Sequence, residues 1–213
     1  MDGRARSTYE HGALWTLDLQ APLPAAVTPL CPATFAEAGR EETAALAAAM
    51  GLPDAGEIRR RFAAGRRCFV ERCDGRLAAY GWVSTGPEHV GEMERTFRVP
   101  DDEVYIWDCA TLPEFRGRRL YSALLSGILV RMRADGVPRA WIGAGLVNRP
   151  SVRGIVNAGF QPVVQVVYAR RLALHVLRIS GEPGAPRPLV RAARRIVLTG
   201  REWALGPLVV GIG

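Results

Sequence analysis

The chain contains no lysine, since all 28 of its basic residues are arginine. The amine with which proteins form Schiff bases is therefore missing, and the protein has no lysine of its own to acetylate. Its four cysteines and three histidines are scattered and match no zinc-binding spacing, so we predict no metal site. We expect the cysteines to be buried, reduced thiols.

Arginine is abundant where lysine is absent. The 28 basic residues outnumber the 21 acidic ones, which gives a formal net charge of +7. Because arginine makes planar, two-pronged contacts with carboxylates and phosphates, this excess indicates an anionic ligand. We expect no nucleic-acid partner, because acidic residues lie between the arginines and aromatic residues make up only 8% of the chain.

Hydrophobic residues make up 48% of the 213 residues and charged residues 23%. Such a composition is typical of a globular chain that buries a large core without disulfides. The uncharged stretch 19–36 contains four prolines, which signal peptides and membrane-spanning helices do not carry. We therefore expect a cytoplasmic protein with no integral membrane segment.

The hydrophobic patterns predict an α+β fold. Strands are expected over 14–19, 67–72, 76–84, 103–112, 140–146 and 160–172. Helices are expected over 34–50, 54–64, 118–134 and 148–158. Asp74-Gly75 predicts a hairpin turn between two of the strands, and the polar segment 86–102 is expected to be irregular.

The composition changes after residue 180. Residues 181–188 are rich in glycine and proline and predict a linker. Residues 189–198 have a helical pattern, with Arg191 and Arg195 one turn apart. This helix either packs on the domain or contacts a membrane surface or a partner. We predict one domain over 1–180, followed by a linker and a basic tail over 181–213.

The segment 112–121 joins a predicted strand to the longest predicted helix. A helix start presents unpaired backbone N–H groups and the positive end of the helix dipole, and phosphates bind there. Gly117 permits a tight turn, and Arg116, Arg118 and Arg119 add positive charge. The residues alone therefore predict an anion-binding turn.

Two motifs at a characteristic separation resemble the GNAT superfamily of N-acetyltransferases. In that superfamily an Arg/Gln-x-x-Gly-x-Gly/Ala turn cradles the coenzyme A pyrophosphate, and Arg116 stands at the first position of this turn. About 30 residues later an Asn-x-x-Ala/Ser helix ends in Gly-Phe, which Asn148, Ser151 and Gly159-Phe160 match. The resemblance covers residues 66–172.

The resemblance implies a mixed, mostly antiparallel sheet of about six to seven strands. Helices would flank this sheet, and its two central strands would splay apart in a V. It implies direct transfer of an acetyl group from acetyl-CoA to a primary amine of a small molecule in a ternary complex, without a metal. A bacterial enzyme and a homodimer are compatible with it. The cofactor-binding residues that it implies are Cys109, Thr111, Leu112, Arg116, Gly117, Arg118, Arg119, Leu120, Tyr121, Asn148 and Ser151.

The chain departs from the pattern of the superfamily at five positions. Arg119 and Tyr121 occupy the two glycine positions of the turn. Ile155, Trp107 and Gly143 stand where many members have a tyrosine acid, a carboxylate and a glutamate. Three common catalytic positions are therefore vacant. This vacancy motivates an alternative function, a non-catalytic module that binds acyl-CoA.

Acyl transfer still has physical support without those side chains. Backbone N–H groups over 109–112 are expected to polarise the thioester carbonyl. A base contributes only about 10²–10⁴-fold, and a chain of waters can replace it. Asp108 is the candidate catalytic residue. Inside an apolar strand it is either an anchor or base for the amine, or a buried structural partner of an arginine or of backbone amides.

Four further residues are candidates for the acceptor side. Glu92 and Glu94 lie in the polar segment before the long strand, either in a substrate loop or as solvated charges. Tyr105 and Trp107 share one face of that strand, where they line an acceptor pocket or belong to the core.

Two residues of the predicted cofactor site also have a structural alternative. Tyr121 either stacks beside the cofactor or simply opens its helix. Asn148 contacts the pantetheine arm, caps its helix, or does both.

Overall fold

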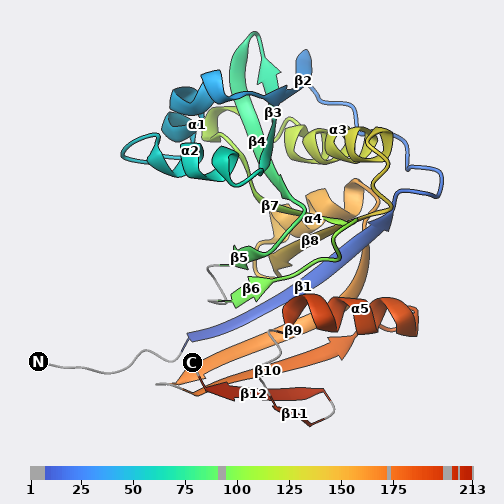
Figure 1. Ribbon diagram of the computed structural model, residues 1–213. Coiled ribbons are helices and arrows are strands. Elements are labelled where there is room, and N and C mark those ends of the chain that lie inside the picture. Colours follow the sequence, from blue (N-terminus) through green and yellow to red (C-terminus); the bar gives the residue numbers. More distant parts are fainter. Residues whose placement is uncertain (1–7, 91–94, 172–173, 199–202, 206, 213) are drawn as a thin grey trace, which may run out of the picture.

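The computed structural model describes residues 8–90, 95–171, 174–198, 203–205 and 207–212. Glu92 and Glu94 lie outside these ranges. Within them one sheet has the strand order β11-β12-β10-β9-β1-β8-β7-β4-β3-β2 (Figure 1). Its strands are β1 (Thr8–Asp18), β2 (Ala33–Ala38), β3 (Arg67–Cys73), β4 (Arg76–Ser84), β7 (Val104–Thr111), β8 (Arg139–Gly145), β9 (Gln161–Arg171), β10 (Leu174–Gly181), β11 (Trp203–Leu205) and β12 (Leu208–Ile212). A separate small sheet consists of β5 (Glu88–Val90) and β6 (Arg95–Phe97).

Helices cover both faces of the large sheet (Figure 1). They are α1 (Thr43–Ala49), α2 (Gly56–Ala63), α3 (Leu120–Ala134), α4 (Arg149–Asn157) and α5 (Arg187–Val197). Apolar residues of α3 and α4 share one core cluster with Ile106 of β7 and Ile142 of β8. On the opposite face, α1 and α2 pack on β3 and β4, and α5 packs on β9 and β10. This opposite face therefore has helices at its two ends, and the small β5–β6 sheet lies between them beside α5 (Figure 1).

The central strands β7 and β8 separate after a short contact. They are the one parallel pair among the described strands, and they pair only over Val104–Ile106 and Ala140–Ile142. Both strands continue beyond this contact, β7 to Thr111 and β8 to Gly145. The mixed, mostly antiparallel sheet and the V-shaped splay that the sequence predicts are confirmed.

The described sheet has more strands than the six to seven expected, because short strands extend both of its edges. One of them is β2, for which a helix over 34–50 is the wrong prediction. Alanine favours helix, but β2 pairs along β3, and Phe35 stacks on Phe69 with ring centroids 5.6 Å apart. Pairing and packing override the local preference, and the helix is confined to α1.

The other local predictions are confirmed in full or in part. Asp74 and Gly75 have φ values of 51° and 75°, and they form the hairpin turn between β3 and β4 as predicted. The segment 86–102 is not wholly irregular, because it contains β5 and β6. Helix α5 packs on the domain, as one of the two alternatives has it: Ala193 and Ile196 are buried, while Arg191 and Arg195 are exposed. The boundary at residue 180 stays a prediction.

Candidate acyl-transfer site

Strand β7 has a bulge just after it leaves β8. The pairing of β7 with β4 shifts by one residue there, so that Asp108 and Cys109 together face Gly81. Asp108 has a φ of 43°. A Cβ atom on Gly81 would lie 2.8 Å from the Cys109 Sγ atom, so glycine is required opposite the bulge. The bulge breaks the alternation of side chains along β7 and turns the carboxylate of Asp108 outward.

The outward turn corrects one prediction for Asp108. The sequence predicts a carboxylate buried with Val104, Ile106 and Ala110, but the Asp108 side chain is 34% exposed. Its Oδ2 atom accepts a hydrogen bond from Arg61 Nη1 at 2.5 Å. The alternative of an arginine partner is therefore what the structure shows. A contact between Asp108 and an amine stays a prediction.

A network of polar side chains builds one wall beside Asp108. The Arg61 guanidinium lies 4.5 Å from the ring centroid of Trp107. The Trp107 Nε1 atom donates to Ser84 Oγ at 2.7 Å, and Ser84 donates to Glu88 at 2.6 Å. Glu88, which is buried, also accepts from Arg66 Nε at 2.6 Å. Trp107 thus lies between two ion pairs, Arg61–Asp108 and Arg66–Glu88. Many members of the GNAT superfamily have a carboxylate at the position of Trp107.

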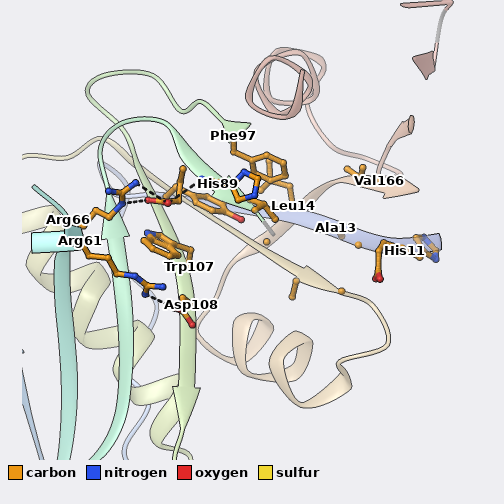
Figure 2. Close-up of a pocket in the computed structure, with 18 of the residues that line it drawn as sticks. His11, Ala13, Leu14, Arg61, Arg66, His89, Phe97, Trp107, Asp108 and Val166 are labelled. Carbon is orange, nitrogen blue, oxygen red and sulfur yellow. Dashed lines mark hydrogen bonds and ion pairs between the residues drawn. The ribbon is translucent and has the colours of Figure 1, made fainter. Parts of the chain in front are cut away.

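A cavity of about 830 Å³ lies against this wall, lined by residues of α2, of the β5–β6 sheet and of the central strands (Figure 2). Glycines without side chains form its floor on two adjacent strands: Gly12 of β1, and Gly143 and Gly145 of β8. A Cβ atom on Gly143 would stand 2.8 Å from the Tyr105 hydroxyl oxygen. Its polar and aromatic lining residues are Glu10, His11, Glu57, Arg60, Arg61, Arg66, Glu88, His89, Phe97, Tyr105, Trp107 and Asp108. Tyr105 and Trp107 therefore both line the cavity, and Tyr105 is at the same time buried in a core cluster, so both alternatives hold for it. Their contact with an acceptor stays a prediction.

Glu10 is a cavity residue that sequence reasoning missed. It is half-buried, and among the described residues it has no hydrogen-bond or ion-pair partner. Neighbouring His11 differs, because its Nε2 atom lies 3.1 Å from Gln165 Oε1. Because strand side chains alternate, Glu10, Gly12 and Leu14 share the cavity face of β1. This alternation is visible in the sequence, but the cavity above it is not.

The predicted anion-binding turn lies on the other face, at the start of α3. Gly117 has a φ of 77° and confirms the tight turn. Arg119 has a φ of 60°, at the position where the superfamily pattern has glycine. No side chain of the described residues caps the first turn of α3, so its leading N–H groups have no side-chain acceptor there. Arg119 thus adopts the left-handed backbone conformation that glycine would adopt there, at a strain cost of about 1 kcal/mol or more.

The side chains around this turn fit a diphosphate and its attached arm. Arg116, Arg118 and Arg119 are exposed and have no acidic partner within the described ranges. Arg116 Nε instead reaches back to the backbone oxygen of Thr111 at 3.4 Å. The Thr111 hydroxyl is buried, and it finds no partner in the described part of the chain. An unsatisfied hydroxyl at the end of β7, followed in the turn by three arginines without an acidic partner among the described residues, is the kind of donor set that a polar, anionic ligand needs.

The backbone of β7 offers fewer free donors than predicted. The Leu112 N–H group donates to the Ala78 carbonyl oxygen at 2.9 Å, so Leu112 cannot polarise a thioester carbonyl. Successive N–H groups of a strand point to opposite sides. The Thr111 N–H group therefore points toward the splay. The Cys109 side chain packs between Gly81 and α3, and burial raises the pKa of its thiol. Its contact with the cofactor stays a prediction.

The start of α4 closes this face. Asn148 accepts a hydrogen bond from the Ser151 backbone N–H at 3.2 Å and so caps α4. Tyr121 opens α3 and packs on α4, since a Cβ atom on Gly154 would stand 2.2 Å from its ring. Burial raises the pKa of Tyr121 well above its usual value. Ile155, at the position of the tyrosine acid, is buried in the core. The cofactor contacts of Asn148, Ser151 and Tyr121 stay predictions.

The two half-sites lie on opposite faces of one slot. The anion-binding turn and the Thr111 hydroxyl are on the α3 face, because Thr111 pairs with Ala79 of the α3 core cluster. The cavity is on the other face. The splay between β7 and β8 connects them. A sheet whose splay joins an arginine-rich helix start on one face to a cavity on the other is the arrangement that acyltransferases of this fold class share.

Comparison with known families agrees with this class. The profile of the Acetyltransferase (GNAT) family matches residues 36–160. The chain therefore belongs to the GNAT acetyltransferase family. None of the curated proteins matches it.

Solved structures show the same fold at low identity. A GCN5-related N-acetyltransferase from Sphaerobacter thermophilus is similar with a TM-score of 0.54 and 16% identity, over 83% of this chain and 53% of that one. A GNAT-family acetyltransferase from Colwellia psychrerythraea has 0.52 and 15%, over 76% and 56%. One from Novosphingobium aromaticivorans has 0.51 and 18%, over 86% and 78%. The chain thus spans little more than half the length of the first two.

Two further features of the described residues concern membranes and metals. No helix among them is long and apolar enough to cross a membrane. No group of three or more histidine, cysteine or acidic side chains is placed there to hold a metal ion.

Proposed function

We propose that the protein transfers an acetyl group from acetyl-CoA to a primary amine of a small molecule, by direct transfer in a ternary complex. The observation that carries this proposal is the slot between β7 and β8, which joins an uncapped, arginine-rich helix start to a cavity of about 830 Å³. A cavity of this size accommodates a small-molecule acceptor.

The donor side would be held by the chain's own groups on the α3 face. Arg116, Arg118 and the first N–H groups of α3 would bind the diphosphate. The Thr111 hydroxyl and N–H group would hydrogen-bond the pantetheine arm. When bound, acetyl-CoA supplies the activated acetyl thioester. The Thr111 N–H group would then stabilise negative charge on its carbonyl oxygen, in place of the vacant side-chain positions.

The acceptor side would use the carboxylates of the cavity. Asp108 lies next to the slot, and its Oδ2 atom is bound to Arg61. Its Oδ1 atom has no partner among the described residues and is available to the acceptor amine. We assign Asp108 to orient this amine and to take its proton directly or through water. Arg61 holds the carboxylate in place for this role.

Glu10 would bind a second positive charge of the acceptor. The charged arginines of the cavity are each paired with a carboxylate, whereas Glu10 has no partner in the described chain. Leu14 is level with Gly143 at the slot, and Glu10 is four residues further along β1, or roughly 13 Å at the rise of a strand. This spacing favours an elongated amine with a cationic group at its far end.

Calorimetric titration of coenzyme A, followed by a thiol-release assay over a panel of amines, tests the proposal. The expected result is saturable binding and turnover, with 1,8-diaminooctane favoured over octylamine. Tight binding of acetyl-CoA without turnover on any amine would support the non-catalytic module instead. Absence of coenzyme A binding would refute both functions. Contact of Glu92 and Glu94 with substrate, the cytoplasmic location and a homodimer stay predictions.

A further inference from the structure

Two cysteines far apart in the sequence meet beside the turn before α3. Cys73 ends β3, opposite Ala33 of β2, and Cys31 lies two residues before Ala33 on the same side. The Cys31 Sγ and Cys73 Sγ atoms are 2.7 Å apart. Two sulfur atoms that are not bonded do not normally come this close, and a disulfide needs only a further shift of well under an ångström.

The two thiols differ in access. Cys31 is half-buried and is reachable from solvent, whereas Cys73 is 1% exposed. Burial and the hydrogen bond with Cys31 raise the pKa of the Cys73 thiol to about 11, and the positive charge of Arg118 acts in the opposite direction. Cys31 is therefore the thiol that an external reagent meets first, and Cys73 is the thiol that resolves.

The pair is coupled to the proposed diphosphate turn through the backbone. The Leu30 N–H group donates to the Arg118 carbonyl oxygen at 2.9 Å. A disulfide at Cys31 would thus restrict the neighbouring Leu30, whose N–H group is hydrogen-bonded to the turn at Arg118. The other two cysteines are elsewhere, since Cys68 belongs to the core on the opposite face and Cys109 packs against α3.

We propose that Cys31 and Cys73 form a dithiol modification site, whose reactant is a low-molecular-weight disulfide. The Cys31 thiolate attacks this disulfide, forms a mixed disulfide and releases one small thiol. The Cys73 thiolate then attacks the Cys31 sulfur, closes the Cys31–Cys73 disulfide and releases the second small thiol. The protein loses two electrons and two protons, and the small disulfide gains them. This site does not depend on the acyltransferase function.

Oxidation should stabilise the fold, because it closes a loop of 42 residues. A cross-link over such a loop restricts the unfolded chain. For a protein of this size, the melting temperature should rise by about 5–10 °C.

The test incubates the reduced protein with oxidised glutathione at mildly alkaline pH and then counts thiols after denaturation. The expected result is a fall from four thiols to two, with the Cys31 and Cys73 peptides joined in the mass spectrum. The melting temperature should rise, and a reductant should reverse the rise. Cys31→Ser and Cys73→Ser should each abolish the rise, while Cys68→Ala should retain it even if its starting stability is lower.

Local hydrogen exchange supplies a readout independent of global stability. At labelling times too short for global unfolding to contribute, oxidation should slow exchange of the Leu30 amide, which donates to Arg118, and should leave amides of β9 unchanged. A glutathione adduct that stays on Cys31 without closing would overturn the proposal. So would four remaining thiols after oxidation, or an equal rise in melting temperature in Cys31→Ser.

Discussion

The two faces of the splayed sheet use arginine in opposite ways. On the α3 face, Arg116 and Arg118 have no acidic partner among the described residues. In the cavity on the other face, Arg61 and Arg66 are bound to carboxylates at 2.5 and 2.6 Å. Paired arginines are part of a wall, since their charge is already neutralised. Unpaired arginines at a helix start leave positive charge free for an anion. On this difference rests the proposal that the diphosphate binds on one face and the amine on the other.

Reversing the charge of the unpaired arginines should have the largest effect. In the double variant Arg116→Glu and Arg118→Glu, we expect the dissociation constant of coenzyme A to rise by at least about 100-fold, because two charge-assisted contacts are replaced by repulsion. Calorimetry measures this. The matched control is Arg40→Glu with Arg59→Glu, two exposed arginines without an ion pair in the described chain. Equal weakening by both double variants would mean that only net charge matters.

A carboxyl group of the α3 face should govern the pH dependence of stability. Burial raises the pKa of Glu71 from 4.5 to about 7, and the side chain is 4% exposed. The folded protein holds this proton more tightly than the unfolded chain does. Stability from this group is therefore full below pH 4.5, falls as the pH rises to about 7, and then levels off, by roughly 3 kcal/mol at most.

Urea unfolding between pH 5 and pH 8 checks this prediction. Glu71→Gln should be more stable than the parent at pH 8, and its unfolding free energy should depend less on pH. Glu41→Gln, at an exposed position, should keep the pH dependence of the parent. If the unfolding free energy of the parent rises from pH 5 to pH 7 by the same amount as that of Glu71→Gln, Glu71 does not control the pH dependence.

The contact between α3 and α4 should be sensitive to one methyl group. Gly154→Ala would place a Cβ atom 2.2 Å from the Tyr121 ring, so we expect a loss of about 2 kcal/mol in unfolding free energy. Tyr121→Ala in the same chain should relieve the clash, and the double variant should be more stable than the sum of the two single effects. Strict additivity in chemical denaturation would show that the two residues do not touch.

The acceptor face should respond to Glu10 with a smaller, selective effect. Glu10→Gln should raise the KM for a diamine by about tenfold while kcat changes little, because a charge contact to the bound acceptor is lost. Octylamine, which lacks the second charge, should show the same KM in both proteins. Coenzyme A affinity should not change. An effect on coenzyme A binding would place Glu10 on the coenzyme A side and contradict the proposal that the two substrates bind on opposite faces.

Local signals predicted much of the fold and the backbone turn before α3. The hairpin at Asp74-Gly75 and the turn at Gly117 need left-handed backbone, and glycine at these positions indicates it directly. Helix α3 follows from its apolar periodicity. The family resemblance predicted the splay, which no local pattern contains. Strand β2 was missed because an alanine-rich segment favours helix until β3 pairs with it.

The acceptor side was largely out of reach of the sequence. Its cavity exists because Gly12 and Gly143, far apart in the chain, lie on neighbouring strands. The bulge at Asp108 depends on Gly81 of another strand, so the exposure of that carboxylate could not be inferred from β7 alone. Glu10 stands out only because no other described residue of the folded chain pairs with it.

Hydrogen exchange with and without coenzyme A tests the division of the two faces most directly. The account predicts slower exchange over residues 109–121, including the Thr111 and Tyr121 amides, and no change at the cavity residues of β1 and α2. Slower exchange over 10–14 and 57–66, with the turn at Arg116 unchanged, would contradict it.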